Sequence, residues 1–149
     1  FKYKGFEVNL LFQGVGKYSK TISGVGAYES EYQGVFTDLH LKAWTPERWN
    51  NGEEVTYPAL SLKASTNHQP NSFFIMDASY LRLKNAEIAY TLPLNTSKKV
   101  FAEKIRFSLS GQNLFTIDNM RSKHIDPEIA NMGTFQPYRV YNIGVSLTF

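Results

Sequence analysis

Apolar side chains occupy every second position in four separate stretches of the chain. The most regular stretch is the last one, whose apolar members are Tyr141, Ile143, Val145, Leu147 and Phe149. Because successive side chains of a strand point to opposite faces, a period of two is typical of a β-strand with one apolar face. The sequence therefore predicts strands over residues 6–13, 80–92, 105–115 and 139–149.

The alternation changes phase within the second predicted strand. Ala86, Ile88 and Tyr90 share one face, whereas Leu81 and Leu83 fall on the other. Two explanations stay open at this point. Either a β-bulge shifts the phase, or the first part of the strand meets a different environment from the rest.

The connections between the predicted strands are very unequal in length. They cover about residues 17–78, 93–104 and 116–138. Strands paired in chain order alternate in direction, so the two long connections emerge at one end and the short one at the other. Compact soluble domains prefer connections of about 4–6 residues, whereas outer-membrane barrels combine short turns on one side with long loops on the other. The pattern predicts an all-β fold of antiparallel strands that form part of a large transmembrane β-barrel.

Strand length and local helix signals agree with this fold class. Ten extended residues rise about 33 Å, which a tilt near 40° projects onto roughly the 25 Å apolar band of such barrels. Inside the first long connection, Thr45-Pro46-Glu47 predicts an N-cap followed by a short helix near Arg48 and Trp49. In the short connection, the sequence TSKK at 96–99 predicts a single helical turn.

Composition narrows the function classes. A content of 42% hydrophobic and 15% aromatic residues excludes a disordered chain, and a net charge of +3 is too weakly basic to indicate nucleic acid. Uninterrupted apolar runs are far shorter than the ~18 residues of a spanning helix. A mean hydropathy of −0.33 still allows a membrane barrel, because alternation hides its hydrophobicity. Without cysteine there is no disulfide or thiolate metal site.

Motifs that could carry chemistry are weak. The sequence GVGK at 14–17 is not a phosphate-binding loop, because Tyr18 replaces the required Ser or Thr and position 11 is Leu rather than Gly. His40, His68 and His124 fall in the long connections without tight ligand spacing, and are interpreted as solvated loop residues.

Acidic residues do not form a persuasive catalytic pair either. Asp126 and Glu128 flank Pro127, which indicates a rigid acidic turn. A general acid and base would also need a cleft between them. No catalytic residue, cofactor site or metal site is predicted.

Seven short motifs follow one another along the chain. They are GFE at 5–7 with LFQGVG at 11–16, WTPE at 44–47, ASYLRLKN at 78–85, YTLP at 90–93, SGQNLFT at 110–116, IDPE at 125–128 and GVSLTF at 144–149. In this order they resemble the C-terminal end of the SusC/RagA family of TonB-linked outer-membrane transporters. The resemblance spans nearly the whole chain, apart from residues 17–41.

The resemblance implies a plugged barrel of the 22-stranded class, of which residues 1–149 would supply the last four strands. Residues 17–78 and 116–138 would be extracellular loops and 93–104 a periplasmic turn, in the outer membrane of a Gram-negative bacterium. The plug domain and the segment that engages TonB would lie upstream of this chain. The implied function is import of large nutrients such as glycans or peptides with a SusD-like surface lipoprotein, and not an enzymatic activity.

Two groups of aromatic residues are candidate contacts. Trp44, Trp49 and Tyr57 lie in the first long connection, where aromatic rings stack on sugars, anchor a partner or pack the loop on itself; the packing interpretation is favoured. At the C-terminus, Phe149 with Leu147 and Tyr141 resembles the signature read by the barrel-assembly machinery. The Phe149 ring would also join an aromatic girdle at the lipid interface.

Arg82 and Lys84 are candidate cations at the outer rim of the barrel. If the second strand keeps one phase, both share a face with Ile88 and Tyr90, which would meet lipid. A cation at the midplane of a barrel costs about 2–4 kcal/mol but only about 0–1 near the interface. Both are therefore expected high, paired with anionic head groups. A bulge near Asn85 would instead turn them into the lumen.

A soluble β-sandwich carbohydrate-binding module is the alternative, since it also has alternating strands and aromatic loops. It leaves about sixty residues of loop unexplained, and it requires the apolar strand faces to be buried. Exposure of Phe107, Leu109, Ile143, Val145 and Leu147 separates the two classes, with Ser108, Ser110, Asn142 and Ser146 on the opposite face. A glycoside-processing enzyme lacks a persuasive carboxylate pair.

Overall fold

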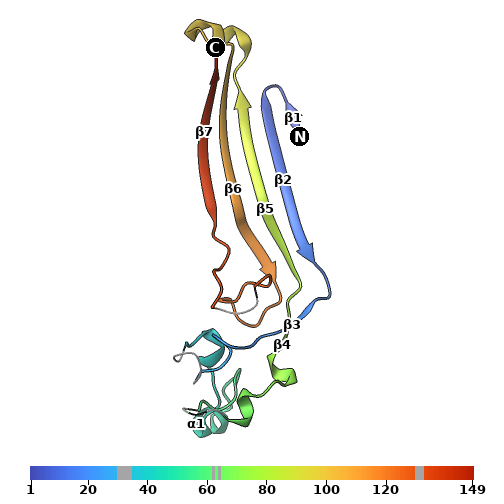
Figure 1. Ribbon diagram of the computed structural model, residues 1–149, viewed down its shortest axis with the longest axis vertical. Helices are drawn as coiled ribbons and strands as arrows, with labels where there is room; N and C mark the ends of the chain where they lie inside the picture. Colours follow the sequence, from blue (N-terminus) through green and yellow to red (C-terminus); the bar gives the residue numbers. More distant parts are fainter. Residues whose placement is uncertain (30–34, 62, 64, 130–132) are drawn as a thin grey trace. The chain divides into compact units, whose positions relative to one another are not determined.

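The computed structural model describes residues 1–29, 35–61, 63, 65–129 and 133–149 (Figure 1). The chain divides into two compact units. We call the first the sheet unit; it comprises Phe1–Gly14, Leu81–Ile117 and Pro137–Phe149. The second, the loop unit, comprises Val15–Tyr80 and Asp118–Gln136.

The sheet unit is built on one five-stranded sheet with the order β1-β2-β5-β6-β7. The strands are β1 (Lys2–Tyr3), β2 (Phe6–Val15), β5 (Tyr80–Thr91), β6 (Lys104–Asp118) and β7 (Val140–Thr148). The arrows of β2, β5, β6 and β7 alternate in direction (Figure 1). The four predicted strands are therefore confirmed, adjacent in chain order. The sheet is not closed within this chain.

The predicted pairing of the last two strands is confirmed in detail. β6 and β7 are antiparallel from Lys104↔Thr148 to Gln112↔Val140. This register sets Phe107 opposite Val145 and Leu109 opposite Ile143. Apolar residues therefore share one face across both strands.

One residue inside β6 has a left-handed backbone. Asn113 has a φ of 51°, in the region that Asn tolerates better than most residues. β5 and β6 are joined on either side of it, since Leu92 N–H donates to the carbonyl of Ile105 and Arg82 Nε donates to Thr116 Oγ1.

The regular alternation of β6 is interrupted next to Asn113. A Cβ on Gly111 would lie 2.4 Å from the Leu114 side chain, although the two residues are three positions apart along the strand. A bulge near Asn85, which the sequence left open, stays a prediction.

The short connection between β5 and β6 is helical at the predicted residues 96–99, but the helical segment is longer than the single turn expected. It consists of α2 (Leu94–Ser97) and the 3-10 helix η4 (Lys98–Val100), and Phe101 follows with a φ of 59°. After the turn, Glu103 N–H donates to the carbonyl of Thr148, which joins the turn to the end of β7.

The loop unit has a core of its own. It contains a two-stranded antiparallel sheet of β3 (Ser19–Thr21) and β4 (Ile75–Asp77), the 3-10 helices η1 (Asp38–His40), η2 (Thr66–His68) and η3 (Ser72–Phe74), and the α-helix α1 (Pro46–Asn50). The predicted helix start is confirmed, since Thr45 Oγ1 accepts from Arg48 N–H at 3.1 Å. The buried cluster includes Ile22, Ala27, Tyr28, Leu39, Tyr57, Phe74, Met76 and Ile125. Residues from both long connections thus pack together. Among the described residues, no helix has the length and apolarity to span a membrane.

Candidate functional site

One face of the sheet unit is apolar and exposed. Its members are Phe107, Leu109, Ile143, Val145 and Leu147, and the exposed fractions of Leu109 and Ile143 are 52% and 86%. Phe107, Leu109 and Ile143 border, together with Ile88, a shallow hollow of about 360 Å³. A soluble protein rarely leaves so continuous an apolar surface uncovered. The predicted exposure is confirmed, and the burial that a β-sandwich module requires is not found.

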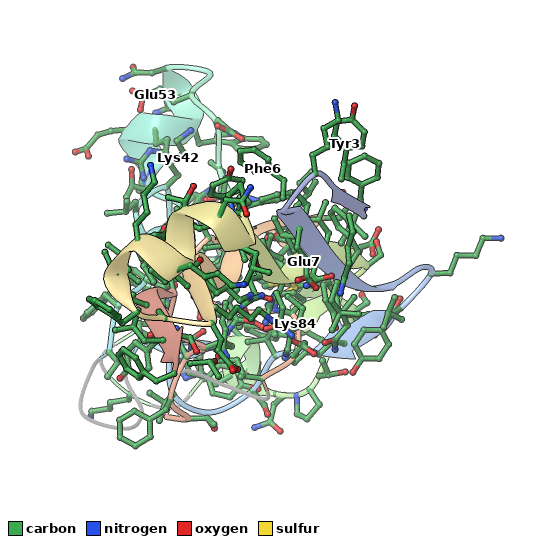
Figure 2. All side chains as sticks on the ribbon, turned by 90° about the horizontal axis from the view of Figure 1, so that it is seen from above. Tyr3, Phe6, Glu7, Lys42, Glu53 and Lys84 are labelled. Atoms are coloured by element: carbon green, nitrogen blue, oxygen red, sulfur yellow. The ribbon has the colours of Figure 1, made fainter. Side chains whose placement is uncertain are left out.

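The opposite face of the sheet unit is polar. Arg106 lies 2.9 Å from a carboxylate oxygen of Glu87 and 3.5 Å from one of Glu7, and Asn9 Nδ2 donates to Glu87 at 3.2 Å. Figure 2 labels Glu7 and, apart from it, Phe6, the preceding residue of β2. Phe6 belongs to the apolar face, where its ring lies 4.4 Å from that of Tyr90.

The predicted polar positions of β6 and β7 share the face of Arg106. The register pairs Arg106 with Ser146, Ser108 with Gly144 and Ser110 with Asn142. Ser108 and Ser110 are half-buried, whereas Asn142 and Ser146 are exposed, because β7 is an edge strand of this sheet.

Arg82 is not exposed to head groups as expected. Its exposed fraction is 1%, and its Nε donates to Thr116 Oγ1 at 2.9 Å across the strand pair. Lys84 is half-buried. A buried guanidinium held by protein groups has no surface to offer a lipid phosphate, so that part of the prediction is corrected for Arg82. The height of both residues in the membrane stays a prediction.

The three candidate aromatic residues of the loop unit have different environments. Tyr57 is buried in the core of the unit, in agreement with the packing interpretation. Trp44 and Trp49 are exposed, Trp49 by 65%. Trp44 N–H donates to the carbonyl of Tyr57 at 2.9 Å, which anchors the segment before α1. Contact of the two tryptophans with a ligand or partner stays a prediction.

Glu29 is the centre of a buried polar network that the sequence did not reveal. Its Oε1 accepts from Ser61 N–H at 2.7 Å and lies 3.0 Å from His68 Nε2, and its Oε2 lies 2.9 Å from the Tyr57 hydroxyl. Burial alone raises the pKa of the Glu29 carboxyl, but these hydrogen bonds outweigh it and hold the pKa below its ordinary value. The carboxylate thus joins three distant segments of the first long connection.

His40 and His68 were expected in solvent, and that interpretation is wrong. Both are buried, and His124 is exposed as expected. Thr37 N–H donates to His40 Nδ1 at 2.9 Å, and the His40 ring lies 4.4 Å from the Tyr57 ring. Burial lowers the pKa of His40, which favours the neutral imidazole. The loop unit has enough core to enclose these rings, which a structureless loop would not.

Asp38 joins the two long connections. Its carboxylate accepts from the Ser122 hydroxyl and from Lys123 N–H, and His124 Nδ1 lies 3.2 Å away. The Ser122 hydroxyl donates to Asp38 and accepts from the backbone N–H of His124, not from its ring, so the three do not form a nucleophile–base relay. No group of three or more His, Cys, Asp or Glu side chains within the described part of the chain could hold a metal ion.

Comparisons with known proteins agree with this geometry. No family model matches the chain. It is 30% identical over 99% of its length to TonB-dependent receptor P3 of Formosa agariphila, and 30% identical over 88% to TonB-dependent receptor P26 of the same organism. The chain spans about 15% and 13% of those two proteins.

Solved structures show the same fold. The RagAB peptide importer in its open-open state matches 99% of the chain with a TM-score of 0.68 and 24% identity. A structure of the RagAB peptide transporter matches the same share with a TM-score of 0.68 and 22% identity. In both, the match covers 16% of the larger chain. The resemblance predicted from the seven motifs is thereby confirmed: the chain is related over nearly its whole length to a segment of the SusC/RagA type of TonB-dependent receptor of the Gram-negative outer membrane.

Proposed function

We propose that this chain forms four adjacent strands in the wall of a TonB-dependent importer, with its apolar face in lipid and its polar face toward the lumen. The observation that carries the proposal is the opposition of two faces in one sheet. Leu109 and Ile143 are exposed on the apolar side, while Arg106 is bonded to Glu87 on the other. A barrel wall between lipid and a polar lumen needs this division.

The arrangement of the whole importer is part of the proposal. Residues 17–78 and 116–138 form extracellular loops, residues 93–104 form a periplasmic turn, and plug and TonB contacts come from other regions. The packed core of the loop unit supports ordered external loops. RagAB is named a peptide importer, which favours large nutrients such as peptides or glycans, delivered with a SusD-like lipoprotein.

Lipid contact can be tested with cysteines introduced into the full-length protein, since this chain has none of its own. A fluorophore on Leu109→Cys is expected to be quenched by brominated acyl chains in reconstituted vesicles, because the residue lies on the apolar face. The same fluorophore on Ser110→Cys, on the polar face, is the control and should stay unquenched. Equal quenching at both positions would contradict the proposed orientation.

Phe149→Ala is expected to lower the amount of assembled transporter at the cell surface. The ring is exposed just beyond β7 and continues the apolar alternation of that strand, as the assembly machinery's signature requires. Phe101→Ala is a matched control, because Phe101 is also an exposed aromatic residue, in the turn bonded to the end of β7. Surface labelling of intact cells measures the effect, and wild-type abundance of the Phe149 variant would refute the role.

A further inference from the structure

The loop unit contains a hollow that the barrel wall does not explain. Its volume is about 560 Å³, within the range of small-ligand sites. The lining residues come from both long connections, with Leu39, Leu41, Val55 and Phe73 as apolar walls and Arg121 and Thr56 as polar groups. Leu41 is 75% exposed, so the apolar wall reaches the surface.

The acidic groups at this hollow already have partners of their own. The Asp38 carboxylate stays charged, but it accepts hydrogen bonds from the Ser122 hydroxyl and Lys123 N–H, and His124 Nδ1 lies 3.2 Å away. Glu54 forms an ion pair with Lys42, which Figure 2 labels near α1. Among the described residues, neither carboxylate forms an ion pair with Arg121.

Two basic residues line the hollow, and among the described residues Lys42 forms an ion pair whereas Arg121 forms none. Its guanidinium lies 4.5 Å from the centre of the Phe73 ring and donates to the carbonyl of Phe73. A guanidinium has five N–H donors, so most of them are left for a ligand. Partial burial lowers the pKa of Arg121, as expected for a desolvated cation. Stacking on Phe73 holds the planar donor group in place, which favours bidentate recognition of a carboxylate.

The apolar walls indicate what must accompany the carboxylate. Leu41 and Val55 are aliphatic, and the Phe73 ring already has the Arg121 guanidinium over it, so the walls suit a branched or aromatic side chain. The Thr56 hydroxyl donates to the carbonyl of Leu39 at 3.3 Å, which leaves its oxygen able to accept from a peptide N–H.

We propose that this hollow binds a peptide carboxylate, with the carboxylate on Arg121 and the neighbouring apolar side chain against Leu41, Val55 and Phe73. The inference rests on the proposed function for the external position of the loop unit, and it adds a preference for acidic peptides. A charge-assisted, bidentate contact of this kind makes Arg121 the main determinant of affinity.

Binding can be measured by fluorescence anisotropy on the purified full-length protein in detergent. The probe is a labelled hexapeptide of apolar residues that ends in Glu, and its twin has amide groups in place of both carboxylates. Arg121→Gln is expected to weaken binding of the acidic probe about tenfold or more, because a charge-assisted hydrogen-bond pair is lost. The amidated twin should bind weakly to both proteins.

Lys123→Gln is the matched control. It removes the same charge two residues away, where Lys123 pairs with Asp118 rather than lining the hollow, and it should leave the affinity unchanged. Leu41→Asp places a carboxylate at the exposed wall of the hollow and should also weaken binding of the acidic probe, because like charges repel. Unchanged affinity in Arg121→Gln, or an equal loss in Lys123→Gln, would overturn the proposal.

Competition separates peptide from sugar acids. An unlabelled acidic peptide should displace the probe, whereas an oligouronate of equal charge should not; displacement by both alike would overturn the peptide assignment. The binding assay needs neither TonB nor uptake. If the acidic probe does not bind while the fluorophore on Leu109→Cys is still quenched by brominated lipid, only the peptide site is overturned and the proposed importer function stands.

Discussion

Leu109→Arg is expected to reduce the folded transporter in the outer membrane severalfold or more. Leu109 lies on the apolar face, opposite Ile143 in the register of β6 and β7. If that face meets lipid, the substitution places a guanidinium in the hydrocarbon layer, which costs about 2–4 kcal/mol near the midplane of a barrel. Heat-modifiable mobility of the full-length protein on gels measures the folded fraction.

Ser110→Arg is the control for this substitution. Ser110 follows Leu109 directly in β6, and its side chain lies on the other face of the sheet. The register sets it opposite Asn142 on the polar face. It borders a hollow of about 450 Å³ that also contains Glu87, so a cation there has room and an acidic neighbour. The folded fraction should stay close to wild type. Equal losses in both variants would mean that the apolar face does not meet lipid.

Glu29→Ala is expected to destabilise the loop unit by a few kcal/mol, because each buried polar group left without its partner costs about 1–3 kcal/mol. The substitution removes the acceptor for Ser61 N–H and the partner of His68 and the Tyr57 hydroxyl. Hydrogen exchange of residues 35–61 in the full-length protein measures the change. Glu53→Ala is the control, because the Glu53 carboxylate makes exposed contacts, an ion pair with Arg48 and a hydrogen bond from Asn51, and exposed ion pairs contribute little.

The contribution of Glu29 should also depend on pH in a defined direction. The pKa of Glu29 in the folded protein lies below the ordinary value of 4.5, so the folded protein favours the ionised carboxylate more than the unfolded chain does. The stabilisation is therefore complete above about pH 4.5 and is lost as the pH falls through the folded pKa. Glu29→Gln should exchange faster than wild type at neutral pH and approach it under acid conditions. A constant difference from pH 7 down to pH 3 would contradict this role.

The fold class could be predicted from the sequence because the alternation of apolar and polar residues in a strand is a local property. The pattern Tyr141, Ile143, Val145, Leu147 placed one face of β7 correctly without any knowledge of its neighbours. The helix α1 was equally local, since Thr45 and Pro46 satisfy the first N–H groups and set the backbone at its start. Connection lengths then indicated which strands are adjacent.

Only the tertiary structure decided which polar residues of the long connections are buried. Glu29 forms contacts with Tyr57, Ser61 and His68, which lie 28 to 39 positions away along the chain. No sequence motif predicts contacts over such separations. Arg82 was expected at a lipid surface but is enclosed beside Thr116, since the cross-strand neighbour of a residue depends on the register of the partner strand. The left-handed backbone of Asn113 was likewise not predicted, because nothing in the residues around it indicates a positive φ. Burial and register come from contacts between distant segments, and a pattern read along one strand contains no information about them.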